Sequence, residues 1–330
     1  MLFKTILLEK NDTKFSCEVS SLSKKELFKQ EGDTLIQVQY SSLNYKDALA
    51  ITNKGPVVRM WPMIPGIDGV GTVIHSVNRQ YKEGDSVILN GWGCGETHWG
   101  CLSQYAYLKS DWLIPLPPNM TPQQAMNIGT AGYTAALCVQ CIIDHGVKPE
   151  QGRILVTGAT GGVGSIAIML LAKLGYSITA ATSKMQDTDY LYQLGASHCI
   201  DRKILSESGK PLQKEQWIAA IDVLGSHTLA NICAQIQYGG IVAACGLAQG
   251  LDFPSTVAPF ILRGITLAGI DSVMTPYQKR IAAWNFLATY LDAQQLNHIA
   301  NIITLDQCQL AAENMFSGRI KGRFIVDVNQ

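Results

Sequence analysis

The sequence predicts an α/β protein in which a doubly wound parallel sheet is inserted into a β-rich domain shaped as a partly open barrel. Three observations lead to this prediction. Short apolar runs separated by Gly, Pro and Asp fill the chain up to about residue 124. A glycine-rich turn at 158–164 then lies between a strand-like and a helix-like segment. An apolar strand, 323–328, follows near the C-terminus.

The first region contains four short apolar runs, at 35–40, 71–75, 86–90 and 103–108. Their spacing is typical of antiparallel strands in a barrel. Thr121 and Pro122 then fit the start of a helix, with Thr as the N-cap and Pro at the first helical position.

The middle region alternates strands and helices in the way that builds a parallel sheet. Strand 153–157 leads to helix 165–174 and strand 177–182, and three later runs fit further strands: 219–223, 240–245 and 265–269. A helix at 277–290 and the last strand follow. Because that strand needs a sheet to join, we expect one domain from residues 1–124 and 271–330 and a second from 125–270. Chemistry is expected at the cleft between them.

The glycine-rich turn has the order that a dinucleotide pyrophosphate requires. Glycines let the backbone turn tightly and approach phosphate without a Cβ in the way, and the following helix N-terminus supplies unpaired N–H groups. A glycine cluster alone is weak evidence, and its place between strand and helix strengthens it. The predicted cofactor contacts from this turn are Gly158, Thr160, Gly161, Gly162, Val163 and Gly164.

The end of strand 177–182 indicates which dinucleotide is bound. Folds that bind NAD usually carry Asp or Glu here, which accepts hydrogen bonds from the adenosine ribose. This chain instead has Thr182, Ser183 and Lys184, with no carboxylate before Asp187. A hydroxyl and an ammonium suit a 2′-phosphate, so we predict NADP(H) bound by these three residues. The alternative is that Ser183 and Lys184 are ordinary loop residues.

Composition and charge exclude several other classes of protein. The 330 residues are 47% hydrophobic and 16% charged with a formal net charge of zero, so neither nucleic acid nor an anionic membrane is an expected partner. No run of about 18 apolar residues lacks charges and turn formers, so no membrane span is expected. Nine cysteines without a pairing rhythm favour free thiols in a reducing cytoplasm.

Three strings carry a resemblance to a known family: SLNYKDAL at 42–49, GWGCGETHWG at 91–100 and FILRGITLAGIDSVMTP at 260–276. Over nearly its whole length the chain resembles the medium-chain dehydrogenase/reductase superfamily. This implies a Rossmann-type domain inserted into a GroES-like catalytic domain. The chain is most similar to the zinc-free, quinone oxidoreductase-like branch, and within it to the acryloyl-CoA reductases of the YhdH/AcuI type.

The resemblance locates the three positions that hold catalytic zinc in the zinc-dependent members. Here they carry Asn44, Ile67 and Asn127. A carbon-only side chain cannot bind zinc, and amides are poor ligands beside thiolate or imidazole. Cys94 and Cys101 alone cannot close a structural zinc site. We therefore expect no metal.

A site without a metal suits conjugate reduction better than alcohol oxidation, which loses its Lewis acid. Hydride adds to the β-carbon of an activated alkene, and a few donors stabilise the charge that develops on the carbonyl oxygen. The resemblance implies NADPH-dependent reduction of acryloyl-CoA to propanoyl-CoA. The alternatives are reduction of a quinone or another α,β-unsaturated carbonyl, and a non-enzymatic role as a crystallin-like or NADPH-sensing protein.

The resemblance also implies four site residues outside the glycine-rich turn. Tyr45 is expected at the nicotinamide, where its phenol orients the ring, donates a proton or only packs. Asn44 either bonds the substrate or holds its turn. Thr130 is expected under the nicotinamide, and Arg323 either reaches the cofactor diphosphate or is a surface charge. A homodimer joined through edge strand 265–269 is expected from relatives.

Four other residues have competing interpretations. His98 is explained as well by hydrogen bonds to backbone as by catalysis, and Asp68 is better explained by anchoring its surroundings. Lys46 and Arg263 are candidates for binding the phosphates of coenzyme A, or are ordinary surface charges.

Overall fold

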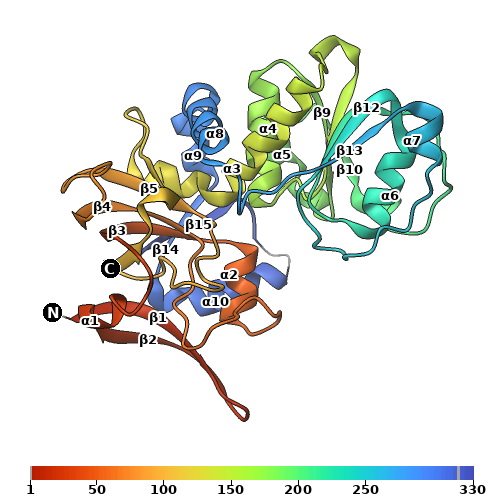
Figure 1. Cartoon of the computed structure of the whole chain (residues 1–330). Helices are drawn as coiled ribbons and strands as arrows, with labels where there is room; N and C mark the ends of the chain where they lie inside the picture. The colour runs from red at the N-terminus through yellow and green to blue at the C-terminus, as the bar shows by residue number, and fades with distance from the viewer. Residues whose placement is uncertain (1, 318–319) are drawn as a thin grey trace. The chain divides into compact units, whose positions relative to one another are not determined.

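The structure, a computed structural model, describes residues 2–317 and 320–330 (Figure 1). The chain forms two compact units. Unit 1 comprises Met1–Thr130, Val273–Ala288 and Leu296–Gln330, and unit 2 comprises Ala131–Ser272 and Thr289–Gln295. The domain boundaries predicted above stay a prediction. The predicted boundary at 124 lies a few residues before the end of the first segment of unit 1, because the first turns of a long helix, α3 (Pro122–Asp144), belong to that unit. Residues Thr289–Gln295, which the prediction placed in the first domain, belong to unit 2.

Unit 1 is built mainly on antiparallel strands. Its larger sheet has the order β14-β15-β3-β4-β5-β7, with β6 paired to β3, and β1 and β2 form a separate hairpin. The β14–β15 pair is parallel. The strands are β1 (Leu2–Lys10), β2 (Phe15–Ser23), β3 (Thr34–Leu43), β4 (Asp68–Ser76), β5 (Ser86–Asn90), β6 (Tyr105–Leu108), β7 (Leu113–Pro115), β14 (Ala300–Thr304) and β15 (Arg323–Asp327).

The last strand completes the core of unit 1. Strand β15 pairs with β3, with Ile325 opposite Ser42, which confirms that the C-terminal segment joins the first sheet. Leu8 of β1, Ile36 of β3 and Val326 of β15 are buried in one hydrophobic cluster. Full burial of such a side chain stabilises the fold by about 1.5–3 kcal/mol, so segments far apart in the sequence depend on one another.

Unit 2 contains the predicted doubly wound sheet, and the fold class is confirmed. Six parallel strands have the order β10-β9-β8-β11-β12-β13. Helices α4 (Gly162–Lys173) and α5 (Thr188–Gln193) lie on one face of the sheet, and α6 (Ser226–Gln235) and α7 (Ala258–Arg263) lie on the other (Figure 1). Chain order reverses beside β8, which is where such sheets bind ligands. The strands are β8 (Arg153–Val156), β9 (Ser177–Thr182), β10 (His198–Asp201), β11 (Trp217–Asp222), β12 (Ile236–Ala244) and β13 (Thr266–Gly269).

The helices confirm most of the predicted positions. They are α1 (Lys24–Leu27), α2 (Tyr45–Ile51), α3 (Pro122–Asp144), α4 (Gly162–Lys173), α5 (Thr188–Gln193), α6 (Ser226–Gln235), α7 (Ala258–Arg263), α8 (Tyr277–Tyr290), α9 (Ala293–His298) and α10 (Cys308–Phe316). Thr121 caps α3 as predicted, since its hydroxyl accepts the Gln124 N–H at 3.2 Å. Helix α4 begins at Gly162 rather than at 165, because glycines of the turn already form its first turn.

Helix α3 is long and apolar enough to satisfy a length and composition criterion for a membrane span. In the structure, however, 72% of its most apolar 18-residue window is buried inside the protein. The helix is also interrupted at Gly129, whose φ of 48° and ψ of −158° are not helical. We therefore interpret α3 as a kinked core helix.

Candidate active site

Asp68 is the centre of a buried hydrogen-bonded cluster in unit 1, and its side chain is inaccessible to solvent. Its Oδ2 accepts hydrogen bonds from Ser42 Oγ at 2.6 Å, from Asn44 Nδ2 at 2.8 Å and from the Thr130 backbone N–H at 2.8 Å. Its Oδ1 accepts hydrogen bonds from Thr130 Oγ1 and Asn90 Nδ2, both at 2.6 Å. These donors compensate the carboxylate for lost hydration. We call these residues, together with Arg323, the Asp68 cluster.

Arg323 supplies the positive charge of the Asp68 cluster. Its guanidinium is 4% exposed, and Nη2 lies 3.8 Å from Asp68 Oδ2. Nη1 donates to Asn44 Oδ1 at 3.0 Å, Nη2 to Ser42 Oγ at 2.9 Å, and Nε to the Asn127 carbonyl at 3.2 Å. Burial lowers the pKa of Arg323, and the charge of Asp68 opposes that shift. Arg323 therefore holds the residues of the Asp68 cluster together through its ion pair and hydrogen bonds. Its predicted contact with the cofactor diphosphate stays a prediction.

Asn44 and Asp47 fix the start of α2. The Asn44 N–H donates to Asp47 Oδ2 at 2.9 Å, and Asp47 Oδ1 accepts the N–H groups of Gly66 and Ile67, both at 3.0 Å. Burial raises the pKa of Asp47 to about 6, although the hydrogen bond from Asn44 favours the anion. The Asn44 side chain is engaged on both its oxygen and its nitrogen, so it holds this turn. Its predicted contact with substrate stays a prediction.

Tyr45 is the exposed aromatic residue next to the cluster. It is the first residue of α2 and is 46% exposed. Its ring meets that of Phe316 edge-on, with the ring centroids 5.3 Å apart. One side of the phenol is therefore packed and the other is accessible, as a cofactor contact would require. The roles predicted for Tyr45 remain predictions.

Asn90 connects the Asp68 cluster to α8. The indole Nε1–H of Trp284 donates to Asn90 Oδ1 at 3.0 Å, and Arg280 Nη1 donates to the Asn90 carbonyl at 2.7 Å. Because its Oδ1 is held by the indole, the Asn90 amide can turn only its Nδ2 toward Asp68. The donor that meets Asp68 Oδ1 is thus fixed by the surrounding core.

The kink of α3 brings Thr130 to Asp68. Gly129 has a φ of 48°, which disfavours residues with a Cβ. A Cβ at Gly129 would lie 2.5 Å from both Arg323 Nη2 and Asp68 Oδ2. Only glycine therefore lets the helix backbone approach the ion pair closely enough for Thr130 to donate from its N–H and its hydroxyl. The predicted packing of Thr130 under the nicotinamide stays a prediction.

The residues at the three zinc-ligand positions do not fit a zinc ion. Asn44 belongs to the Asp68 cluster, Ile67 is a buried alkyl side chain, and the Asn127 amide donates to the Leu296 carbonyl. None of these is a thiolate or an imidazole. Within 2–317 and 320–330 no group of three or more His, Cys, Asp or Glu side chains could hold a metal ion.

In unit 2 the glycine-rich turn links β8 to α4. Gly158 has a φ of 56°, and a Cβ there would lie 2.4 Å from Val223 Cγ2. A Cβ at Gly164 would lie 2.5 Å from the Gly158 carbonyl oxygen, so the helix packs directly on the turn. Gly161 precedes α4 and contributes no side-chain cap to its N–H groups. This cradle fits a diphosphate. The predicted contacts of Thr160, Gly161, Gly162 and Val163 lie in it and stay predictions.

Buried side chains hold the ends of β8 and β11 together. Thr157 Oγ1 donates to Asp222 Oδ1 at 2.7 Å and accepts the Val223 N–H at 3.0 Å. Asp222 Oδ2 accepts the Gly225 N–H at 2.8 Å. Burial raises the pKa of Asp222, and these donors oppose the shift. Side-chain hydrogen bonds therefore hold the carboxyl ends of these two central strands beside the glycine-rich turn.

The end of β9 has the geometry of a polar turn without a carboxylate. Thr182 is buried, and its Oγ1 accepts the Lys184 N–H at 3.0 Å. Ser183 lies between them and is exposed. The Thr182 hydroxyl thus shapes the turn that presents Ser183. The predicted contacts of Thr182, Ser183 and Lys184 with a 2′-phosphate stay predictions.

Three of the ambiguous candidates have protein partners. The two ring nitrogens of His98 lie 2.8 and 2.7 Å from backbone carbonyl oxygens. Lys46 forms an ion pair with Glu96 at 2.7 Å, and Arg263 lies 3.3 Å from Glu215. These contacts favour the structural interpretation of each residue.

Sequence reasoning did not find Ser42, Asp47 and Asn90. Asp47 follows Asn44 by three residues, which is the spacing of a helix capping box and could have revealed it. Ser42 and Asn90 reach Asp68 from neighbouring strands, and no local pattern marks either of them.

Two family descriptions match the chain. Residues 30–118 match the alcohol dehydrogenase GroES-like domain, and residues 162–289 match the zinc-binding dehydrogenase family. Full-length relatives are more specific. The chain is 48% identical to the probable acrylyl-CoA reductase AcuI of Escherichia coli over 99% of this chain and 100% of that one. It is 44% identical to the putative quinone oxidoreductase YhfP of Bacillus subtilis over 98% of each.

Solved structures agree with these sequence matches. The YhdH oxidoreductase of Salmonella enterica, crystallised in complex with NADP, superposes with a TM-score of 0.96 at 45% identity, covering 98% of this chain and 99% of that one. YhfP of B. subtilis, crystallised with NAD bound, superposes with a TM-score of 0.95 at 44% identity, covering 99% of this chain and 100% of that one. The chain therefore belongs to the medium-chain dehydrogenase/reductase superfamily, in the group that contains AcuI, YhdH and YhfP.

Proposed function

We propose that the chain is an NADPH-dependent reductase of the activated C=C bond of a short enoyl thioester, converting acryloyl-CoA to propanoyl-CoA without a metal. The observation that carries the proposal is the Asp68 cluster. One of its members, Asn44, stands at a zinc-ligand position, and the chain is 48% identical to a probable acrylyl-CoA reductase. Such an enzyme acts on CH–CH groups and needs no Lewis acid for an alkoxide.

The proposed chemistry needs few protein groups. Bound NADPH supplies a hydride to the β-carbon of the thioester, and negative charge moves to the carbonyl oxygen. The α-carbon then takes a proton from an acid or from water. The exposed phenol of Tyr45 gives this proton or only orients the nicotinamide, and Thr130 lies beneath the ring. Asn44 and Arg323 act as positioning residues, because their polar atoms hold the turn that carries Tyr45.

The cofactor is proposed to be NADP(H) rather than NAD. The glycine-rich cradle of unit 2 accepts a diphosphate of either one. Exposed Ser183 and neighbouring Lys184 supply a hydroxyl and a positive charge where Asp or Glu would repel a 2′-phosphate. Among the relatives, YhdH was crystallised with NADP and YhfP with NAD. The choice between the two dinucleotides is therefore argued from the side chains at the end of β9.

The cofactor proposal is tested by the double substitution Ser183→Ala with Lys184→Ala. We expect NADPH affinity to fall by at least about tenfold, with little change in NADH affinity, because two contacts to one phosphate are lost. Lys173→Ala, an exposed lysine at the end of α4, is the matched control. Equal losses for both dinucleotides would show that these side chains do not contact the phosphate.

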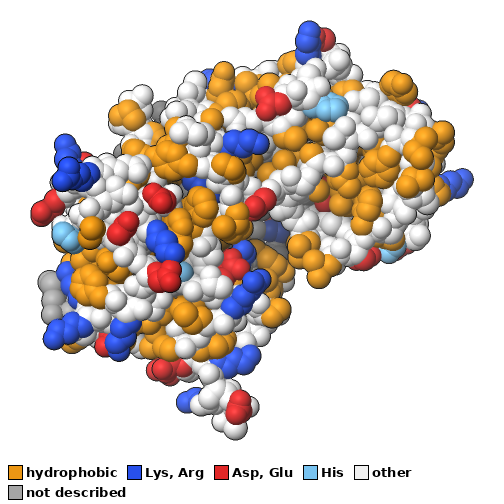
Figure 2. Space-filling model, in the orientation of Figure 1, with side chains coloured by type: hydrophobic (Ala, Val, Ile, Leu, Met, Phe, Trp, Pro, Cys, Tyr) orange, Lys and Arg blue, Asp and Glu red, His pale blue; other side chains and the backbone are white. Residues whose placement is uncertain are grey.

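We also propose a cytoplasmic homodimer. The edge position of β13 in the sheet of unit 2 supports the dimer, as do exposed apolar residues before and within α7, among them Leu251, Val257 and Ile261. Figure 2 shows hydrophobic side chains gathered over this region. The nine free thiols support a reducing compartment. Light scattering on the purified protein distinguishes a dimer from a monomer.

Substrate preference tests the reaction. NADPH oxidation is followed with acryloyl-CoA, crotonyl-CoA and a simple quinone at equal concentration. The proposal predicts a kcat/KM for acryloyl-CoA at least about tenfold higher, which is about 1.4 kcal/mol of transition-state binding. A preference for the quinone supports the second candidate, favoured by the name of YhfP. Absence of turnover with all three supports a non-enzymatic, crystallin-like or sensing role.

A further inference from the structure

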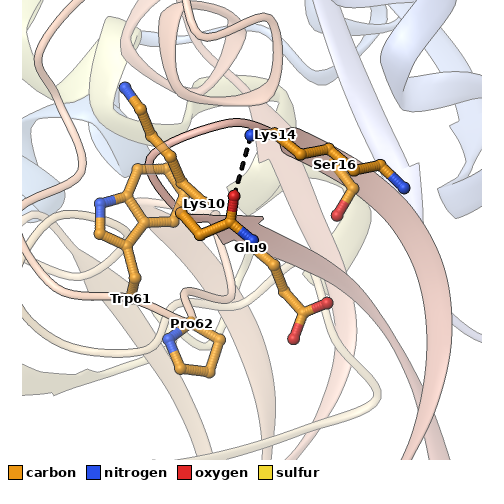
Figure 3. Close-up of a pocket in the computed structure, with 7 residues that line it drawn as sticks. Glu9, Lys10, Lys14, Ser16, Trp61 and Pro62 are labelled. Carbon is orange, nitrogen blue, oxygen red and sulfur yellow. Dashed lines mark hydrogen bonds between the residues drawn. The ribbon is translucent and has the colours of Figure 1, made fainter.

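A polar cavity lies at the distal end of the β1–β2 hairpin in unit 1 (Figure 3). Its volume is about 340 Å³. Lys10, Lys14 and Trp61 line it, together with Ser16 and the carboxylate of Glu9. An indole and two ammonium groups around one open cavity are the side chains that bind a planar base and its phosphates.

The hairpin register fixes the indole wall of this cavity. Lys10 pairs with Phe15 across the hairpin, so both side chains leave the same face. The Phe15 ring meets Trp61 edge-on with centroids 6.2 Å apart, and Lys10 Nζ lies 5.9 Å from the Trp61 ring centroid. Trp61 is thus held by two residues of the hairpin and lines the cavity.

The two lysines bring charge that is not cancelled by an ion pair. Lys10 Nζ donates to the neutral amide of Asn53 at 3.2 Å. Neither Lys10 nor Lys14 has a carboxylate within ion-pair distance among residues 2–317 and 320–330. The Lys14 backbone is held by Asn11, whose Oδ1 accepts its N–H at 2.9 Å. Glu9 lowers the net charge of the cavity and leaves it at +1.

A continuous series of contacts joins the cavity to Tyr45. The Tyr45 ring packs on the Phe316 ring, and Lys54 Nζ lies 4.7 Å from the centroid of the Phe316 ring. Lys54 is the neighbour of Asn53, which accepts the hydrogen bond from Lys10. All of these residues belong to unit 1. A long, flexible ligand with an anionic end could therefore extend along one surface from the exposed phenol to the cavity.

We propose that this cavity binds the 3′-phosphoadenosine diphosphate end of the thioester substrate. The adenine stacks on Trp61, the phosphates meet Lys10 and Lys14, and the pantetheine arm passes Lys54 and Phe316 toward Tyr45. This rests on the proposed function, in that the substrate is a coenzyme A thioester. It replaces Lys46 and Arg263, the sequence candidates for this role, whose charges already have protein partners.

The test compares acryloyl-CoA with the acryloyl thioester of N-acetylcysteamine, which lacks the nucleotide. In Lys10→Ala/Lys14→Ala we expect the ratio of kcat/KM for acryloyl-CoA to that for the truncated thioester to fall at least about tenfold. The KM for NADPH should stay unchanged in this variant. Lys25→Ala/Lys82→Ala is the matched control, because it removes two exposed lysines of unit 1 that do not line the cavity.

A binding measurement keeps the two proposals separable. Calorimetry with adenosine 3′,5′-bisphosphate should show binding to the unmodified protein and at least about tenfold weaker binding to the double variant. An unchanged kinetic ratio, or equal binding of the bisphosphate by both proteins, overturns the cavity assignment and leaves the reductase proposal standing. Failure of the unmodified protein to reduce either thioester overturns the reductase proposal, whereas the binding result still decides whether the cavity takes a nucleotide.

Discussion

Replacing Asp68 by asparagine tests the buried cluster with the least change in shape. The amide puts an NH₂ group where one carboxylate oxygen stood. Oδ2 faces the Thr130 backbone N–H, which can only donate, and Oδ1 faces Asn90 Nδ2, which the Trp284 indole keeps in place. Whichever way the new amide turns, its NH₂ group faces either the Thr130 N–H or the Asn90 NH₂ group, and neither of these can accept a hydrogen bond.

The magnitude follows from two losses. A buried donor left without an acceptor costs about 1–3 kcal/mol. Arg323 also loses its carboxylate partner at 3.8 Å, and breaking a buried ion pair costs about 3–5 kcal/mol. Because the guanidinium keeps its bonds to Asn44, Ser42 and the Asn127 carbonyl, we take the lower part of that range. We expect Asp68→Asn to lower the free energy of unfolding by about 4 kcal/mol.

Urea unfolding followed by circular dichroism measures this loss, and a double-mutant cycle assigns it. In an Arg323→Met background the charge is gone, so the cost of Asp68→Asn should shrink by at least about 1 kcal/mol. A variant too unstable to purify agrees with the expectation, since domains are stable by only about 5–15 kcal/mol. A loss below about 1 kcal/mol in the natural background, or no coupling to Arg323, would refute the reasoning.

Three further changes have defined outcomes. Gly129→Ala should lower the unfolding midpoint by several degrees in a thermal melt, because its Cβ would lie 2.5 Å from the Arg323 guanidinium at a φ of 48°; an unchanged midpoint contradicts this. Burial raises the pKa of Asp47 to about 6 from an ordinary 3.8, so between these values the folded protein holds a proton that the unfolded chain has released. Stability contributed by Asp47 is therefore present below pH 4 and is lost as pH rises through 6. In Asp47→Asn the free energy of unfolding should depend less on pH between these values. The same pH dependence in the variant and in the natural protein counts against the assignment. Gly164→Ala should weaken NADPH binding in a fluorescence titration at least about tenfold, because its Cβ would meet the Gly158 carbonyl at 2.5 Å and displace the turn; unaltered affinity would exclude the cradle.

Much of the fold is predictable from local pattern. The order of strand, glycine-rich turn and helix at 153–174 predicts the parallel sheet, and Thr121 with Pro122 predicts the start of α3, because both signals depend on neighbouring residues. The hairpin partner β2 and helix α10 were not predicted. Strand β2 has no fully buried residue, and α10 is defined by packing against α2.

The candidate site was predictable in part for the same reason. Asn44, Thr130 and Arg323 were singled out through resemblance, and the structure brings all three to Asp68. Their contact with Asp68 depends on the pairing of β3, β4 and β15 and on the kink of α3 at Gly129, and a single sequence shows neither. Arg323 shows the limit most clearly, since its burial among Asn44 and Ser42 comes from the pairing of β15 with β3.

The central claim is that hydride transfer in this protein proceeds beside a buried ion pair and requires no divalent metal. The most direct measurement is kcat/KM for acryloyl-CoA with NADPH before and after exhaustive chelation, with elemental analysis of both samples. The account predicts values within about twofold of each other and no stoichiometric zinc, because Asn44, Ile67 and Asn127 offer it no ligands. Activity that disappears with the chelated metal and returns on adding zinc would contradict the account.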